Sequence, residues 1–214
     1  MIIKVCGMRE ADNIRHVEAL GIDYMGFIFY PKSPRYVPAV PAYLPERTKR
    51  VGVFVDAATP VIMAHIAAFR LHVVQLHGKE TPQQCRKIHD EATKLFGSAP
   101  LIWKAVSVAT AADLSECSHY EDVANGFVFD TKCTAYGGSG EQYDWGILSA
   151  YTGNLPFLLS GGIGPDDADR IIRFRHPRLA GIDLNSRFES APALKDTRPL
   201  EHFIQTIRTN QNLL

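Results

Sequence analysis

The chain has 214 residues, of which 46% are hydrophobic, and its 23 basic side chains are balanced by 23 acidic ones. This composition is typical of a globular protein with a sizeable core, and the zero net charge gives no general attraction to nucleic acid or to an anionic membrane. No run approaches the roughly 20 apolar residues of a membrane span, and the first residues lack the apolar core of a signal peptide.

Eight short apolar runs rich in β-branched residues recur along the chain, separated by longer amphipathic segments. This alternation is typical of strands that alternate with helices. We predict strands over residues 2–6, 24–29, 51–55, 72–76, 101–106, 126–130, 156–160 and 180–184.

Helix candidates lie between these runs, and several open with Thr or Asp at the capping position and Pro in the first turn. They cover residues 9–20, 59–70, 81–92, 165–175 and 197–211. No linker, low-complexity tract or charge block divides the chain, so we predict one domain over 1–214. Eight strand-helix units in that length favour a (β/α)₈ TIM barrel, with an open doubly wound sheet as the alternative.

In such a barrel the chemistry belongs at the carboxyl ends of the strands. Lys4 and Cys6 alternate along the first strand, so both should point into the barrel while Ile3 and Val5 meet the helices. A cation beside Cys6 should favour the thiolate and lower the pKa of the thiol, so that it can act as a base. The alternative is that Cys6 is a small core residue.

The sixth predicted strand ends abruptly in a carboxylate, Asp130, and a loop with Gly137, Gly138 and Gly140 follows. An acid at the end of a buried strand lies where a barrel places catalytic groups. We predict that the glycine loop is a lid over the pocket, with a plain flexible loop as the alternative. Asp130 could instead be structural and cap the next segment.

Two further segments have the chemistry of anion binding. In "SGGIG", Ser160, Gly161 and Gly162 follow the seventh strand, where barrels commonly hold a phosphate. In "YPKSPRYV", Arg35 lies in a loop stiffened by prolines, and its guanidinium matches a carboxylate or a phosphate bidentately. A tight turn and a solvated arginine are the plainer alternatives.

Seven segments, which occur in order along nearly the whole chain, match the motifs of a known enzyme family. They are "KVCGM", "GFIFYPKSPRYV", "VGVFV", "VQLHG", "FDTK" with "GGSG" and "YDW", "LSGGI", and "GIDLNSRFE" followed by "KD". Together they resemble the phosphoribosylanthranilate isomerase family of tryptophan biosynthesis.

The resemblance implies a (β/α)₈ barrel that isomerises N-(5′-phosphoribosyl)anthranilate to 1-(2-carboxyphenylamino)-1-deoxyribulose 5-phosphate, an Amadori rearrangement, without a metal or organic cofactor. It implies Cys6 as general base and Asp130 as general acid, and it places Arg35 at the anthranilate carboxylate. Acid and base roles require a raised pKa for Asp130 and a lowered one for Cys6. The other substrate contacts that we expect are Lys4, Gln75, His77, Gly137, Gly138, Gly161, Gly162, Asp183, Asn185 and Ser186.

One position departs from the family pattern: "DLNSRFE" has Arg187 where the family usually has glycine in the turn after strand eight. Since backbone amides can bind the phosphate without a side chain, we expect the Arg187 guanidinium to lie outward along the barrel rim.

Two other functions are compatible with parts of the sequence. Lys104, near the end of the fifth strand, could form a Schiff base as in class I aldolases. A non-catalytic sensor of a phosphorylated ligand is the second. The four cysteines show neither CxxC spacing nor the histidine pattern of a zinc site, so we expect free thiols and a cytoplasmic location. The sequence leaves the oligomeric state open between a monomer and a homodimer.

Overall fold

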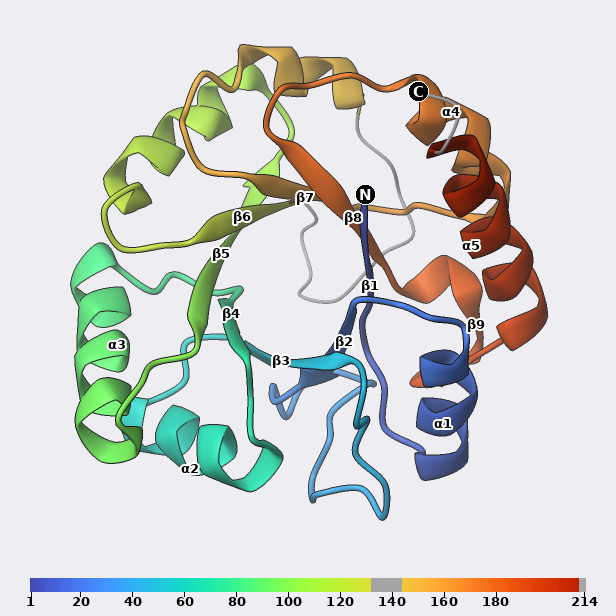
Figure 1. The fold of residues 1–214 in the computed structure, drawn as a ribbon. Helices are drawn as coiled ribbons and strands as arrows, with labels where there is room; N and C mark the ends of the chain where they lie inside the picture. The colour runs from blue at the N-terminus through green and yellow to red at the C-terminus, as the bar shows by residue number, and fades with distance from the viewer. Residues whose placement is uncertain (132–143, 212–214) are drawn as a thin grey trace.

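In the computed structural model, which describes residues 1–131 and 144–211, eight parallel strands close into a barrel (Figure 1). Each strand pairs with the next in the chain, and β8 pairs with β1. The strands are β1 (Ile2–Val5), β2 (Tyr24–Ile28), β3 (Lys49–Phe54), β4 (Val73–Leu76), β5 (Leu101–Val108), β6 (Gly126–Thr131), β7 (Phe157–Leu159) and β8 (Leu179–Leu184). The predicted strands are thus confirmed to within two residues at each end, and the open sheet is excluded.

The helices lie outside the strands (Figure 1). The α-helices are α1 (Ala11–Ala19), α2 (Thr59–Phe69), α3 (Pro82–Phe96), α4 (Ala168–Arg173) and α5 (Thr197–Gln211), and the 3₁₀ helices are η1 (Ala111–Tyr120), η2 (Trp145–Ala150), η3 (Pro165–Asp167) and η4 (Ser186–Phe188). Helix α3 begins in a capping box, in which Thr81 and Gln84 exchange hydrogen bonds, and it ends at Gly97 with a φ of 78°. A hairpin of β9 (Glu189–Ala191) and β10 (Leu194–Lys195) follows β8.

Among the described residues, three connections between barrel strands carry no α-helix, and none of them was among the five helix candidates. The β2–β3 connection, residues 29–48, contains no helix, because its prolines at 31, 34, 38, 41 and 45 remove backbone donors and restrict the residues before them. Only 3₁₀ helices, η1 and η2, are described after β5 and β6.

Alternation along the strands separates two apolar clusters. Ile3 and Val5 of β1 pack outward against the helices, whereas Cys6 belongs to the cluster inside the barrel and Lys4 is fully buried. The alternation predicted for β1 is therefore confirmed. Inside the barrel, the rings of Tyr24 and Trp103 pack with their centroids 4.8 Å apart.

Within the described ranges, no helix is long and apolar enough to cross a membrane. Among the same residues, no group of three or more His, Cys, Asp or Glu side chains is arranged to hold a metal ion.

Candidate active site

A pocket opens at the carboxyl ends of the strands and encloses about 740 Å³ of empty space, including its open mouth. Parallel strands direct their last side chains to the same end of the barrel, which is why residues distant in sequence meet here. The lining residues, among those described, are Cys6, Ile28, Tyr30, Ser33, Val53, Val55, Gln75, His77, Asp130, Ser160, Gly161, Gly162, Ile163, Asp183, Asn185 and Ser186.

The pocket collects most of the residues that we predicted as site residues. Cys6, Gln75, His77, Asp130, Gly161, Gly162, Asp183, Asn185 and Ser186 line it. Lys4 and Arg35 are buried and do not line it. Gly137 and Gly138 lie outside the described residues, so the lid stays a prediction.

Three polar lining residues, Tyr30, Ser33 and Ser160, were not among the expected substrate contacts, although Ser160 belongs to the turn predicted to bind an anion. Tyr30 and Ser33 lie in the proline-stiffened loop that contains Arg35, and Ser160 precedes Gly161 in the "SGGIG" turn. Their position in loops at the carboxyl ends of strands would have allowed these residues to be predicted.

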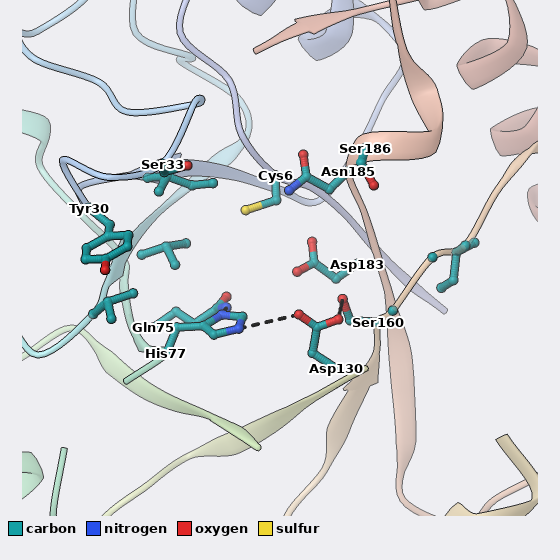
Figure 2. A pocket seen from close by; sticks show the side chains of 16 residues that line it. Cys6, Tyr30, Ser33, Gln75, His77, Asp130, Ser160, Asp183, Asn185 and Ser186 are labelled. Carbon is teal, nitrogen blue, oxygen red and sulfur yellow. Dashed lines mark hydrogen bonds and ion pairs between the residues drawn. The ribbon is translucent and has the colours of Figure 1, made fainter. Parts of the chain in front are cut away.

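Cys6 and Asp130 face the pocket from opposite sides, with Asp183 between them in the view of Figure 2. Below the pocket, the Lys4 ammonium donates to Asp183 Oδ2 at 2.6 Å. Burial alone would lower the pKa of Lys4, but the charges of Asp183 and of the Cys6 thiolate outweigh burial and raise it. Lys4 is therefore a protonated cation beside the thiol.

The predicted lowering of the Cys6 pKa is wrong. Burial raises the pKa of this thiol above its ordinary value, and the positive charge of Lys4 opposes that effect without reversing it. The sequence placed a cation at the correct side of Cys6, but it gave no measure of desolvation, which penalises the thiolate.

The sulfur of Cys6 lies against bare backbone of β2. A Cβ added to Gly26 would come within 2.6 Å of Cys6 Sγ and 3.1 Å of Cys6 Cα, far inside van der Waals contact. Only glycine therefore lets β2 pass beneath the thiol at this distance.

We expect Gly26→Ala to displace the Cys6 side chain and to lower kcat, with a loss of stability of about 1–3 kcal/mol from overpacking. Gly21→Ala is the control, because it adds a Cβ at a φ of 72° with nothing within 4 Å. It should lower the melting temperature while leaving kcat unchanged. Equal kcat for both variants would show that Gly26 does not set the position of the thiol.

Asp130 has polar neighbours on two sides. Its Oδ2 lies 3.4 Å from His77 Nε2, and Ser160 Oγ lies 3.4 Å from its Oδ1 (Figure 2). The other ring nitrogen of His77, Nδ1, lies 3.1 Å from Gln75 Nε2. Asp130 is therefore held at the mouth of the pocket, with 22% of its side chain exposed.

Two buried oxygens near the pocket, Gln75 Oε1 and Asp183 Oδ1, accept no hydrogen bond from any described residue. An unsatisfied buried acceptor destabilises a fold by about 1–3 kcal/mol, so such atoms call for a ligand that donates. Both side chains line the pocket, and hydroxyl groups of a polyol would supply these donors.

The turn after β7 has the backbone that its glycines allow. Gly161 and Gly162 have φ angles of 92° and 67°, which other residues rarely adopt, and both line the pocket, as do Asn185 and Ser186 after the neighbouring strand β8. Nearby, Arg187 is exposed, and its Nε would lie 3.1 Å from a Cβ on Gly164. Its side chain therefore lies over the turn that precedes η3.

Arg35 differs from the expectation of a guanidinium held out on a stiff arm. It is 93% buried, and its Nε and Nη2 donate to the carboxylate of Glu189 at 2.7–2.9 Å. The sequence could not reveal this pairing, because Glu189 is 154 positions away.

Lys104 lies outside the pocket. It belongs to β5 with its side chain among the carbonyl groups of Leu76, Gly78 and Ala105, which accept from its ammonium at 2.7–3.3 Å. The buried Glu80 carboxylate is 3.6 Å away. This position removes the basis for a Schiff base at Lys104.

Comparison with known proteins agrees with the geometry. Residues 3–206 match the family model described as N-(5'phosphoribosyl)anthranilate (PRA) isomerase. A relative of that name from Phocaeicola vulgatus is 50% identical over 208 residues, which cover 97% of this chain and 98% of the relative. Another from Parabacteroides distasonis is 47% identical over 213 residues, covering 97% and 93%.

Solved structures give the same result. The phosphoribosyl anthranilate isomerase of Thermotoga maritima superposes with a TM-score of 0.82 at 31% identity, covering 98% of this chain and all of that one. A second, with a TM-score of 0.79, 28% identity and the same coverage, is described as the isomerase in complex with reduced 1-(o-carboxyphenylamino)-1-deoxyribulose 5-phosphate. Strand order, pocket and sequence identity thus agree that this chain belongs to the N-(5'-phosphoribosyl)anthranilate isomerase family.

Proposed function

We propose that this chain isomerises N-(5′-phosphoribosyl)anthranilate to 1-(2-carboxyphenylamino)-1-deoxyribulose 5-phosphate, with Asp130 as general acid and Cys6 as general base. The observation that carries the proposal is the placement of these two groups on opposite sides of one pocket. The reaction opens the sugar ring and shifts hydrogen from C2 to C1 within one molecule, so it needs proton transfers but no external oxidant or reductant, and we propose that neither a metal nor an organic cofactor takes part in it.

The two residues act in consecutive steps. Protonation of the ribose ring oxygen by Asp130 breaks its bond to C1, and the anthranilate nitrogen forms a Schiff base with C1. The Cys6 thiolate then removes the C2 proton, and the electron pair of that bond forms an enolamine. Protonation at C1 and loss of the proton of the C2 hydroxyl group then give the ketone, so that the whole reaction neither consumes nor releases a proton. General acid and base groups placed in this way each contribute about 10²–10⁴-fold in rate.

Lining residues of the pocket suit the phosphate and the ribose of this substrate. The turn of Gly161 and Gly162, with Ser186 after the neighbouring strand, suits the phosphate. The unsatisfied oxygens of Gln75 and Asp183 suit the ribose hydroxyl groups. These roles, with those of His77, Asn185 and Lys4, form part of the proposal.

We propose that Arg35 holds the anthranilate carboxylate through the edge of its guanidinium that Glu189 does not use. Glu189 accepts from Nε and Nη2, and Nη1 has no hydrogen-bond partner within the described residues. The pairing then serves to orient the guanidinium.

Arg35→Ala should weaken binding of the substrate by losing a charge-assisted hydrogen bond, about 1.5–3 kcal/mol or roughly 10–100-fold in KM. The measurement compares a substrate analogue with one that lacks the carboxylate. Wild type should prefer the first and the variant should bind both alike, whereas Lys32→Ala, an exposed cation in the same loop, should behave as wild type. A variant at position 35 that still prefers the carboxylate would exclude this contact.

A non-catalytic sensor is the remaining alternative, and a growth experiment separates the two. Expression of the chain in a bacterial strain without this isomerase should restore growth in the absence of tryptophan. A sensor would bind the phosphorylated ligand and leave the strain dependent on tryptophan, even with folded protein present.

We further propose that the protein works in the cytoplasm as a monomer or homodimer. Free buried thiols at Cys6, Cys85 and Cys117 suit a reducing compartment. Among the similar structures is one described as monomers generated from a dimeric isomerase of Thermotoga maritima. Sedimentation of the purified chain measures which state it adopts.

A further inference from the structure

A buried lysine that the mechanism above does not use lies near Cys6. Lys195 is in β10, beyond the last barrel strand, and is 97% buried. Its ammonium donates to Glu189 Oε1 at 2.5 Å and to Asn185 Oδ1 at 2.8 Å. Burial of a lysine is unfavourable unless it is paired in this way.

The backbone of Lys195 is fixed as firmly as its side chain. Asn13 of α1 donates from Nδ2 to the Lys195 carbonyl at 2.9 Å, and its Oδ1 accepts from the Lys195 amide at 2.8 Å. A buried amide side chain thus ties β10 to α1. The two sets of bonds hold the ammonium at one place under the pocket wall.

The Lys195 ammonium lies close to the backbone that follows Cys6. A Cβ added to Gly7, the residue after Cys6, would lie 3.4 Å from Lys195 Nζ and 2.7 Å from Asn185 Oδ1. Gly7 also has a φ of 76°, so only glycine fits there comfortably. Burial raises the pKa of Cys6, the charge of Lys4 opposes that effect, the charge of Asp183 adds to it, and the charge of Lys195 opposes it again.

The buried ion pairs around Cys6 carry a net charge as long as Cys6 is a neutral thiol. Three cations and two anions form this charge cluster: Lys4, Arg35 and Lys195 with Asp183 and Glu189. Their side chains are all less than 10% exposed. With all five groups ionised, the sum is one positive charge, and ionisation of Cys6 brings it to zero. Burial lowers the pKa of Lys195 and raises that of Asp183, and the charge of the partner, Glu189 or Lys4, opposes each effect. A buried net charge is costly, so the cluster favours the thiolate.

Other titratable groups near Cys6 lie elsewhere in the pocket. β2 presents Gly26 to the sulfur, and Asp130 with His77 occupies the opposite side. The cations next to the thiol thus come from β1 and β10.

We propose that Lys195 is a positioning residue that, together with Lys4, stabilises the thiolate of Cys6 and supplies the unbalanced positive charge of the cluster. The inference rests on the proposed role of Cys6 as the base. It also connects the base to Arg35, since Glu189 binds both Lys195 and Arg35.

The test is a titration of the Cys6 thiolate by its ultraviolet absorbance, without substrate. Every protein in this titration carries Cys133→Ser, which removes the fourth cysteine of the chain. From the spectrum of each variant, the spectrum of the same variant with Cys6→Ser added is subtracted. Burial raises the pKa of Cys85 to about 11 and that of Cys117 to about 12, so both remain thiols in the working range. The signal then reports Cys6.

Lys195→Met should raise the pKa of Cys6 by about one unit or more, a tenfold loss of thiolate at a given pH. Glu189→Gln should lower it at a pH where Lys195 stays protonated, because the cluster then gains a positive charge; burial lowers the pKa of Lys195 and Glu189 opposes that effect, so the comparison is made at the low end of the titration. The double variant restores the original sum and should bring the pKa back toward that of wild type. A purely structural network predicts no such reversal.

Lys104→Met is the matched control, since it removes another buried lysine from outside the pocket, and Lys49→Met removes an exposed one. Neither should change the pKa of Cys6. If Lys195→Met fails to fold, Glu189→Gln carries the test alone. An unchanged pKa in folded Lys195→Met, or a raised one in Glu189→Gln, overturns the proposal. Neither result depends on turnover, so failure of the proposed function is recorded separately by the growth experiment.

Discussion

Asp130→Asn is expected to lower kcat by about 10²–10⁴-fold, the usual loss when a general acid is removed. The amide keeps the size of the side chain, and its oxygen and nitrogen can still meet His77 and Ser160, which lie 3.4 Å from the carboxylate. It has no proton to give to the ribose ring oxygen. Steady-state kinetics should therefore show a loss in kcat larger than any change in KM.

The control for this variant is Asp122→Asn, an exposed aspartate away from the pocket. It should have wild-type kinetics and stability. If Asp130→Asn were as active as this control, the acid would have to be another group, and the proposed role of Asp130 would be structural.

Cys6→Ala should reduce kcat by a similar factor, because no other described lining residue is a thiol. Cys85→Ala is the matched control: it removes a buried cysteine of α3, which should lower stability without affecting turnover. Similar kcat values for these two variants would show that Cys6 is not the base.

A thiolate base at Cys6 also predicts the direction in which kcat/KM changes with pH. Since burial raises the pKa of Cys6, the thiolate is the minor form at neutral pH. In wild type, kcat/KM should therefore increase with pH toward and beyond the ordinary pKa of a thiol. The residual rate of Cys6→Ala should lack this increase. A wild-type profile that stays flat over this range would contradict a thiolate base.

Much of the fold could be predicted from the sequence because the barrel strands are buried on both faces. Runs such as residues 51–55 and 126–130 are nearly continuous in apolar residues, which parallel strands require. The exceptions have local causes. The β2–β3 connection lacks a helix because of its five prolines, and the segment 111–120, with two serines and little amphipathic pattern, forms only a 3₁₀ helix.

The site was predictable where it depends on the ends of strands. That Cys6 and Asp130 line the pocket follows from the rule that barrels place chemistry at these ends, whereas their roles as base and acid are implied by the family resemblance. The buried pairs near the pocket could not be predicted from the sequence, because each joins distant segments. Arg35 and Glu189 are 154 positions apart, and Lys195 and Asn13 are 182 positions apart. The raised pKa of Cys6 depends on burial by the closed barrel, which periodicity does not measure.

The most direct test of the proposed activity is the loss of phosphoribosylanthranilate fluorescence upon addition of the purified, folded chain. Wild type should consume the substrate over many turnovers without added metal or cofactor, and Cys6→Ala and Asp130→Asn should be slower by about 10²–10⁴-fold. A folded wild-type protein that binds the substrate but leaves its fluorescence unchanged would contradict the assigned reaction and support the ligand sensor instead.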